Sequence, residues 1–312
     1  MTLPLPIAPQ SPAPARGLFE NLANAFPPRP QRVPQPGQQN DLQQIMGFFT
    51  DTTLCIGCKA CEVACKQWNQ LPSDGFEFTA NSYDNTKHLG ATTWRHVAFK
   101  EKIADETKGD GDGHGNGGTI SRWLMMSDVC KHCQDAPCQH SCPTGSIVYN
   151  EFGDVYLQND ICNGCGYCIA ACPFGVLGRA DAPHDDGHAH KCTLCMDRQS
   201  DDLTPACAKV CPTASIQFGP LPELREAARR RVDDLRERGN ERAYLYGCDS
   251  VGDYGPLNAF FLLEDHPNEY NLPEDPPQPF LGQGIRYLAG AAVAAALMGV
   301  SALIFSHGSN RR

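Results

Sequence analysis

The chain has 312 residues, and its 26 Lys and Arg against 36 Asp and Glu give a formal net charge of −10. This charge argues against a nucleic-acid-binding protein, because phosphate backbones favour a basic surface. With 41% hydrophobic and 20% charged residues the composition is globular, and the length allows more than one domain. Seventeen cysteines, clustered and odd in number, indicate metal ligands and not a disulfide framework.

Residues 1–45 form a proline-rich segment that holds ten of the 25 prolines. Proline interrupts helices, so we expect an extended arm here. The segment lacks the basic start, the continuous apolar core and the twin arginine of export signals, and we do not interpret it as a signal peptide. A strap along a partner and a disordered tail both fit its composition.

Residues 46–220 contain four cysteine motifs and two polar insertions, at 105–119 and 181–190. The first insertion is rich in Asp and Gly but lacks the Glu that closes an EF-hand calcium loop. The second carries His184, His188 and His190 in a Gly, Asp and Pro context. We interpret both as solvated loops with surface histidines.

Residues 221–279 contain one predicted helix, over Pro222–Arg238, with Gly239 at the C′ position. Its basic residues are expected to form i, i+4 pairs on a solvated face. The short apolar run Ala259–Leu263 fits a strand, and 273–279 is a proline-rich linker. The apolar residues at the spacing of one helical face are Leu224, Ala228, Val232 and Leu235.

An uncharged apolar stretch, Tyr287–Phe305, lies near the C-terminus. About 20 such residues match the thickness of a bilayer, so we predict one transmembrane helix over 286–306 and a short tail at 307–312. A helix buried in a protein core is the alternative. Arg311 and Arg312 outnumber Arg286 on the other flank, which favours a cytoplasmic tail and a large domain on the outer, periplasmic face.

Sixteen cysteines fall into four motifs of four. Motifs I and III have the C-x2-C-x2-C-x3-C spacing of bacterial two-cluster ferredoxins, whereas the second gap widens to four residues in motif II and eleven in motif IV. Proline follows the last cysteine of motifs II, III and IV, but Lys66 follows that of motif I. The motifs are I, Cys55, Cys58, Cys61 and Cys65; II, Cys130, Cys133, Cys138 and Cys142; III, Cys162, Cys165, Cys168 and Cys172; and IV, Cys192, Cys195, Cys207 and Cys211.

This spacing suits an iron–sulfur cubane better than zinc. Three thiolates at three-residue steps can hold three corners of a cube, while the fourth cysteine faces a second cube. Zinc prefers two separate C-x2-C arms, which leave a third cysteine in the same arm without a use. Gly57, Gly164 and Gly166 allow backbone N–H groups to approach the sulfurs. Cys248, the remaining cysteine, is expected to be a small buried residue.

The motifs are expected to work in pairs. Motifs II and III are separated by about 20 residues, enough for a hairpin, so they form one pair and motifs I and IV form the other. If the fourth cysteines cross over, four ligand sets follow: set A, Cys55, Cys58, Cys61 and Cys211; set B, Cys65, Cys192, Cys195 and Cys207; set C, Cys130, Cys133, Cys138 and Cys172; and set D, Cys142, Cys162, Cys165 and Cys168. The expected cofactors are four [4Fe-4S] clusters in a line. The chain lacks a phosphate-binding glycine loop, a G-x-S-x-G elbow and an apolar carboxylate pair, so we expect electron transfer and no catalytic residue of its own.

Three stretches carry a family resemblance: Asp51–Asn69, Asn163–Gly175, and HKCTLCMDRQ together with Pro205–Gly219. They resemble the four-cluster iron–sulfur subunits of molybdenum or tungsten oxidoreductases, and most closely the beta subunit of respiratory formate dehydrogenase. The resemblance implies an α+β fold of two ferredoxin-like double-cluster modules plus one C-terminal transmembrane helix. The crossed sets match the family's ligand pattern, and all sixteen positions are cysteine here.

The resemblance also implies the partners. In that family the catalytic subunit carries a pterin-bound metal and oxidises formate, and the beta subunit passes electrons to a cytochrome b in the lipid membrane that reduces quinone. The same electron-transfer chain could serve a polysulfide, sulfoxide or nitrate reductase or a hydrogenase instead. A structural zinc-binding module is the remaining alternative.

Overall fold

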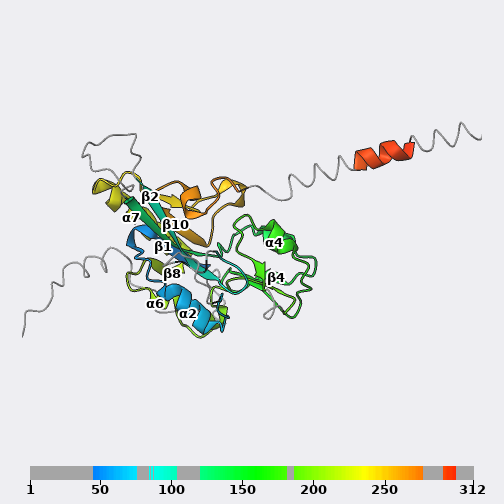
Figure 1. Cartoon of the computed structure of the whole chain (residues 1–312), viewed down its shortest axis with the longest axis horizontal. Helices are drawn as coiled ribbons and strands as arrows, with labels where there is room; N and C mark the ends of the chain where they lie inside the picture. Colours follow the sequence, from blue (N-terminus) through cyan, green and yellow to red (C-terminus); the bar gives the residue numbers. More distant parts are fainter. Residues whose placement is uncertain are drawn as a thin grey trace, which may run out of the picture.

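The computed structural model describes residues 45–75, 84, 86, 88–103, 120–180, 186–276 and 291–299 (Figure 1). The predicted arm at 1–45, apart from its last residue, and the predicted insertion at 105–119 lie outside these ranges. The mixture of helices and strands that the resemblance implied is confirmed.

A four-stranded sheet in the order β8-β1-β10-β9 forms the centre of the fold. β1 (Met46–Asp51) pairs with β8 (Ile216–Pro220) in antiparallel fashion and with β10 (Ala259–Leu263) in parallel, and β9 (Tyr244–Tyr246) pairs with β10. Every residue of β1 and β10 is buried. Burial explains the continuous apolar run of β10, whereas β1 ends in the polar residues Thr50 and Asp51, which are buried as well. The strand expected at Ala259–Leu263 is confirmed, and it joins the same sheet as residues 46–51.

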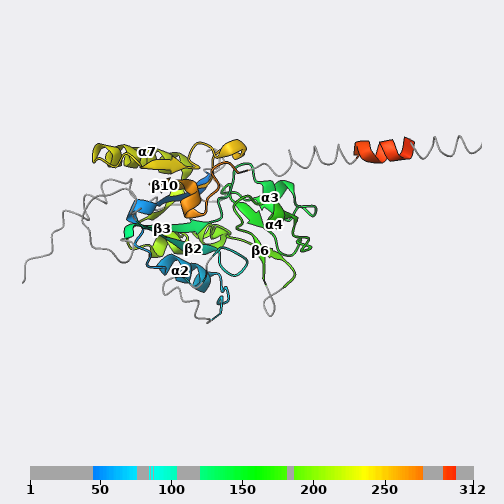
Figure 2. The same ribbon diagram turned by 45° about the horizontal axis from the view of Figure 1, so that its top comes forward.

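Helix α7 (Leu221–Glu237) covers one face of this sheet, and the cysteine-bearing segments lie on the other face (Figure 2). Successive side chains of a strand point to opposite faces. Phe49 and Phe260 therefore pack with α7, while Phe48 and Phe261 belong to the core that includes the cysteines. The helix predicted over Pro222–Arg238 is confirmed, and Gly239 adopts the left-handed conformation of a C′ glycine (φ 90°).

The solvated face predicted for this helix is only partly correct. Glu226 and Arg230 form an exposed i, i+4 pair as expected. Arg231, however, is buried and its Nε lies 2.9 Å from an oxygen of Asp51, which is completely buried in β1. The long arginine side chain thus reaches back to the sheet and ties α7 to the first strand.

Two modules carry the four motifs. In one, α2 (Ala60–Trp68) packs on α6 (Ala206–Val210), and in the other, α3 (Pro137–His140) packs on α4 (Tyr167–Ala171). The second module contains the expected hairpin between motifs II and III, made of β4 (Ile147–Tyr149) and β5 (Val155–Leu157). A long hairpin of β2 (Arg95–Ile103) and β3 (Ile120–Val129) lies beside the first module.

Short elements complete the described part of the chain. β6 (Gly178–Arg179) pairs with β7 (Ala189–His190) at the second predicted insertion, of which 181–185 lie outside the described residues. The others are α5 (Met196–Ser200) and three 3-10 helices, η1 (Thr52–Leu54), η2 (Gly252–Tyr254) and η3 (Pro267–Tyr270).

The predicted transmembrane segment is described only at 291–299, which is helical. None of the helices in the described ranges is both long and apolar enough to cross a membrane. The remainder of 286–306 and the tail at 307–312 lie outside those ranges.

The buried pair between Arg231 and Asp51 makes a prediction about stability. Arg231→Met leaves the Asp51 carboxylate buried without its cationic partner, which costs roughly 3–5 kcal/mol. We expect the melting temperature, followed by far-UV circular dichroism, to fall by roughly 10 °C. Arg230→Met on the same helix is the matched control, since its exposed pair contributes about 0.5 kcal/mol or less. Equal melting temperatures for the two variants would contradict this role.

Candidate metal centres

All four motifs share one local geometry. The third cysteine is the second residue of a helix, and the fourth follows it by four residues. In motifs II, III and IV the fourth cysteine lies just past the end of the helix, whereas Cys65 of motif I lies within α2. The fourth cysteine is therefore displaced from the loop that presents the first three. The third cysteines are Cys61 in α2, Cys138 in α3, Cys168 in α4 and Cys207 in α6.

A left-handed residue stands two positions after the first cysteine of every motif. These residues are Gly57 (φ 63°), His132 (φ 44°), Gly164 (φ 69°) and Leu194 (φ 54°). Positive φ turns the chain back on itself, which brings the cysteines of a C-x2-C unit to one side. At Gly57 a Cβ would lie 2.6 Å from the Phe99 ring, and at Gly164 it would lie 2.0 Å from the Gly187 carbonyl oxygen. Any larger residue would therefore clash at both positions.

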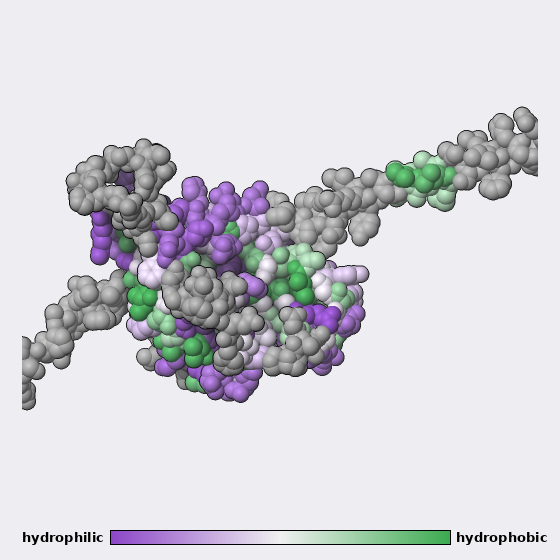
Figure 3. Space-filling view, viewed as in Figure 1, coloured by the Kyte–Doolittle hydropathy of each residue, from purple (hydrophilic) through white to green (hydrophobic). Residues whose placement is uncertain are grey.

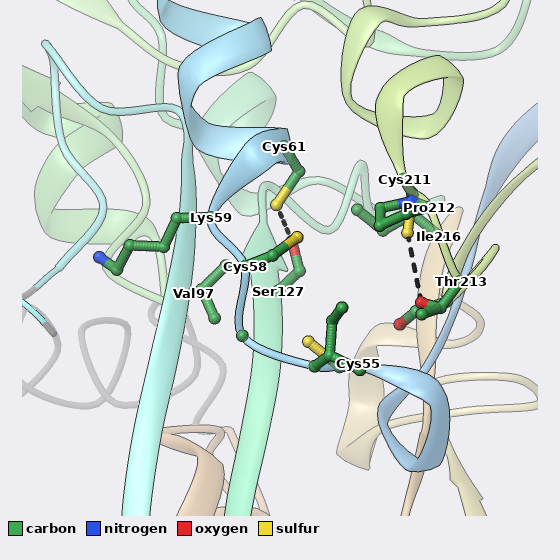
Figure 4. A pocket seen from close by; sticks show the side chains of 13 residues that line it. Cys55, Cys58, Lys59, Cys61, Val97, Ser127, Cys211, Pro212, Thr213 and Ile216 are labelled. Atoms are coloured by element: carbon green, nitrogen blue, oxygen red, sulfur yellow. Dashed lines mark hydrogen bonds between the residues drawn. The ribbon is translucent and has the colours of Figure 1, made fainter.

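Set A surrounds a single cavity (Figure 4). Three of its cysteines come from the loop before α2 and from the first turn of that helix, and Cys211 arrives from the end of α6. The two segments are more than a hundred residues apart in the chain, and β1 beside β8 brings them together. The four cysteines among the residues that line the cavity are Cys55, Cys58, Cys61 and Cys211.

Set C surrounds a second cavity. Here Cys172, which ends α4, joins three cysteines of the motif before it. The cavity is otherwise walled mainly by apolar side chains, among them Phe174 and Val176. Its cysteines are Cys130, Cys133, Cys138 and Cys172.

Sets B and D are brought together as well, as the mutual influence of their thiols shows. Burial, and then the charges of Cys207 and Cys195, raise the pKa of Cys65. Burial, and then the charges of Cys162, Cys142 and Cys165, raise the pKa of Cys168 to about 11. Cys65 and Cys142, the fourth cysteines of their motifs, thus face the neighbouring motif.

The sets also neighbour one another in a fixed order. Cys61 of set A interacts with Cys207 of set B. Cys192 of set B interacts with Cys130 of set C. Cys138 of set C interacts with Cys168 of set D. These electrostatic influences link A to B, B to C and C to D.

Burial makes most of these thiols poor acids on their own. It raises the pKa of Cys61, Cys138 and Cys195 to about 12, so that at neutral pH the bare groups hold their protons. Thiolate ligation here therefore needs a metal cation, which deprotonates a coordinating thiol outright. Cys142 is the exception: although burial opposes it, hydrogen bonds from Ser146 and Thr144 lower its pKa to about 6.

Hydrogen-bond donors surround the sulfurs. The backbone N–H of Leu194 donates to Cys192 Sγ at 3.3 Å and that of Gly164 to Cys162 Sγ at 3.4 Å. Hydroxyl oxygens of Ser127 and Ser146 lie 3.2 Å from the sulfurs of Cys61 and Cys142 respectively. Such donors stabilise the negative charge of a thiolate-ligated group.

Three buried cations accompany the sets, and sequence patterns did not indicate them. Arg95, Lys131 and Lys191 are each at most 2% exposed. Lys131 is paired with Asp128 and also lies over the ring of Phe174, whereas Lys191 donates to the carbonyl oxygens of Val155 and Cys192. Buried cations need nearby negative charge. For Arg95 and Lys191, the thiols are the principal groups that favour the charged form.

The remaining predicted residues lie elsewhere. Cys248 is 1% exposed and packs in the core under α7, as expected of a buried cysteine. His188 contacts the carbonyl oxygen of Cys162, and His190 lies 2.9 Å from Asp186; His184 lies outside the described residues. Within the described ranges, no three Cys, His, Asp or Glu side chains stand close enough together to hold one metal ion.

The donor set fits iron–sulfur clusters. Each set offers four sulfurs and no oxygen or nitrogen ligand, and sets A and C enclose a space between their sulfurs. Thiolate sulfur is the ligand that [4Fe-4S] clusters take. The cluster, when bound, supplies a one-electron redox centre, and the chain supplies ligands, hydrogen bonds and compensating charge.

Comparison with known proteins agrees with this chemistry. Two family models described as 4Fe-4S dicluster domains match residues 54–146 and 121–221. The nitrate-inducible formate dehydrogenase iron–sulfur subunit of Escherichia coli K12 is 38% identical over 248 residues, 78% of each chain. The formate dehydrogenase iron–sulfur subunit of Haemophilus influenzae Rd is 38% identical, over 78% of this chain and 73% of its own.

A more distant relative serves another reaction. The B subunit of the anaerobic dimethyl sulfoxide reductase of E. coli K12 is 33% identical over 180 residues, 58% of this chain and 76% of its own. Two dicluster domains account for four [4Fe-4S] clusters. The chain therefore belongs to the family of formate dehydrogenase iron–sulfur subunits, which are electron-transfer proteins with 4Fe-4S clusters.

Proposed function

We propose that the sixteen cysteines bind the four [4Fe-4S] clusters in the crossed sets A to D. One observation carries this assignment: Cys211 lines one cavity with the first three cysteines of motif I, while Cys65 of motif I faces Cys207 and Cys195. Cys172 joins motif II in the same way. Each motif then contributes three ligands to one cluster and the fourth to its neighbour.

The clusters form a conductor with two ends. Cys58 of set A and Cys165 of set D are exposed, whereas the cysteines of set B are buried. Large apolar side chains are exposed beside each end: Ile56 and Val63 near set A, and Ile161 and Tyr167 near set D. Hydrophobic surface gathers beside α4 and beside α2 and α6 in the view of Figure 3. Electrons enter at one end and leave at the other, where partner subunits cover this surface.

The partner at one end is a formate-oxidising subunit with a pterin-bound molybdenum or tungsten. The names of the relatives at 38% identity support this choice. The other partner is a membrane cytochrome b that passes the electrons to quinone. The dimethyl sulfoxide reductase relative favours a sulfoxide-reducing subunit as the second candidate, with the same four clusters.

The apolar segment 286–306 anchors the chain in the lipid membrane. Its support is the uncharged sequence Tyr287–Phe305 and the helix at 291–299. The arginines at the end of the tail favour a cytoplasmic C-terminus and a large domain on the periplasmic face.

The crossed ligation is tested with four single substitutions. Cys65→Ser should alter the same cluster as Cys195→Ser, and Cys211→Ser the same cluster as Cys58→Ser, because each pair belongs to one set. Electron paramagnetic resonance of reduced protein, prepared without oxygen, identifies which signal is lost or shifted. The wild-type chain should contain about sixteen irons, four per cluster. If Cys65→Ser instead matches Cys58→Ser, the motifs are not crossed; zinc in place of iron would restore the structural alternative.

The choice of catalytic partner is tested on the complex purified through a tag on this chain. We expect a large subunit that contains molybdenum or tungsten, and we expect formate to reduce the clusters and bleach their visible absorption. Dithionite gives the fully reduced reference. A complex whose reduced clusters are instead reoxidised by dimethyl sulfoxide, and which formate does not reduce, would establish the second candidate.

The membrane anchor is tested by ending the chain before Tyr287. The shortened chain should leave the membrane fraction and keep its colour and iron, because the cysteine sets lie before residue 212. Full-length protein carried through the same fractionation is the control. A shortened chain that remains with the membranes would show that a partner provides the attachment.

A further inference from the structure

Arg95, the first residue of β2, is a buried cation without a carboxylate partner among the described residues. Its side chain is completely enclosed, and its guanidinium carbon lies 4.7 Å above the ring of Phe48. Two of its nitrogen atoms, Nε and Nη2, have no hydrogen-bond partner in the described structure. A buried arginine in this state is costly unless negative charge lies close by.

The third nitrogen, Nη1, is engaged with Ser127 on the paired strand β3. It lies 3.3 Å from Ser127 Oγ and 3.4 Å from the backbone oxygen of the same residue. Ser127 Oγ in turn lies 3.2 Å from Cys61 Sγ, a sulfur of set A (Figure 4). Arginine can only donate, so Ser127 accepts from Arg95 and its own proton is free for the sulfur of Cys61.

The principal groups that favour the charged form of Arg95 are cysteines. In decreasing order they are Cys207, Cys61, Cys192 and Cys65, and they raise the pKa of the guanidinium despite burial, which alone would lower it. Three of them belong to set B and one to set A.

We propose that Arg95 sets the reduction potentials of the clusters in sets A and B, acting on set B directly and on set A partly through Ser127 and Cys61. This inference rests on the proposed ligand sets. Reduction adds one electron to a cluster and makes the group inside the cysteines more negative by one charge. A fixed buried cation favours the more negative state, because its attraction is weakly screened in the protein interior. Arg95 is a positioning and charge-compensating residue, not a ligand.

The test is a redox titration of the complete complex, with dithionite as electron donor and electron paramagnetic resonance as readout. In Arg95→Gln, two of the four midpoint potentials should fall. For each of these two clusters the ratio of reduced to oxidised form at a given applied potential should drop about tenfold, which corresponds to 59 mV for a one-electron couple. In Ser127→Ala, one of these two should fall by a smaller factor and the other should stay unchanged. Arg95→Lys keeps the charge and should retain most of the set B potential.

Lys100→Gln is the matched control. It removes one positive charge from the same strand, but at an exposed position paired with Glu269, and should shift none of the potentials. Iron content and the number of cluster signals are measured for every variant, so that loss of a cluster is separated from a shifted potential. Four intact clusters with unchanged potentials in Arg95→Gln would overturn this inference and leave the ligand sets standing. If Arg95→Gln does not assemble, unchanged potentials in Ser127→Ala, or a full tenfold loss in the set B ratio in Arg95→Lys although the charge is kept, would overturn it instead.

Discussion

The burial of negative charge is the constraint on which the rest of this structure depends. Each cluster brings four thiolates into a protein interior that raises the pKa of most of its cysteines. Charge of that kind is tolerated only where cations and hydrogen-bond donors surround it. Arg95, Lys131 and Lys191 provide the cations, and backbone N–H groups of the left-handed turns provide donors.

This constraint also explains how distant segments are held together. Set A needs Cys211 beside residues 55–61, and the antiparallel pairing of β1 with β8 provides that proximity. β10 then closes β1 on its other edge, and Arg231 of α7 pairs with the buried carboxylate of Asp51 just before motif I. The sheet thus aligns the first module. The cysteines of set A in turn connect the segment that follows β1 with the segment that precedes β8.

The four cysteine sets differ in their exposure to solvent. Sets B and C lie between the exposed cysteines at the two ends, and neighbouring sets are close enough for their thiols to influence one another. Large apolar side chains are among the residues exposed at each end, as at surfaces that partners cover. A protein built in this way has no need of a substrate site, because its reactants are electrons that arrive and leave through other subunits.

Much of the chemistry could be predicted from the sequence, because ligand spacing is a local property. Cysteines three and four residues apart are held by one turn and one short helix, so the four motifs, their cofactor and the helix of residues 222–238 could be inferred from the sequence alone. The hairpin between motifs II and III followed from the short separation of those motifs. Predicted sets of cysteines likewise lie together in the structure.

What only the tertiary structure decided involves residues far apart in sequence. No pattern around Arg95 indicates that it is buried beside Cys207 and Cys192, and nothing in the basic run of α7 distinguishes Arg231 from its exposed neighbour Arg230. The order of the four sets along the conductor also depends on how the modules pack. Such features arise from long-range strand pairing and from the electrostatics of burial, which a periodicity in the sequence does not record.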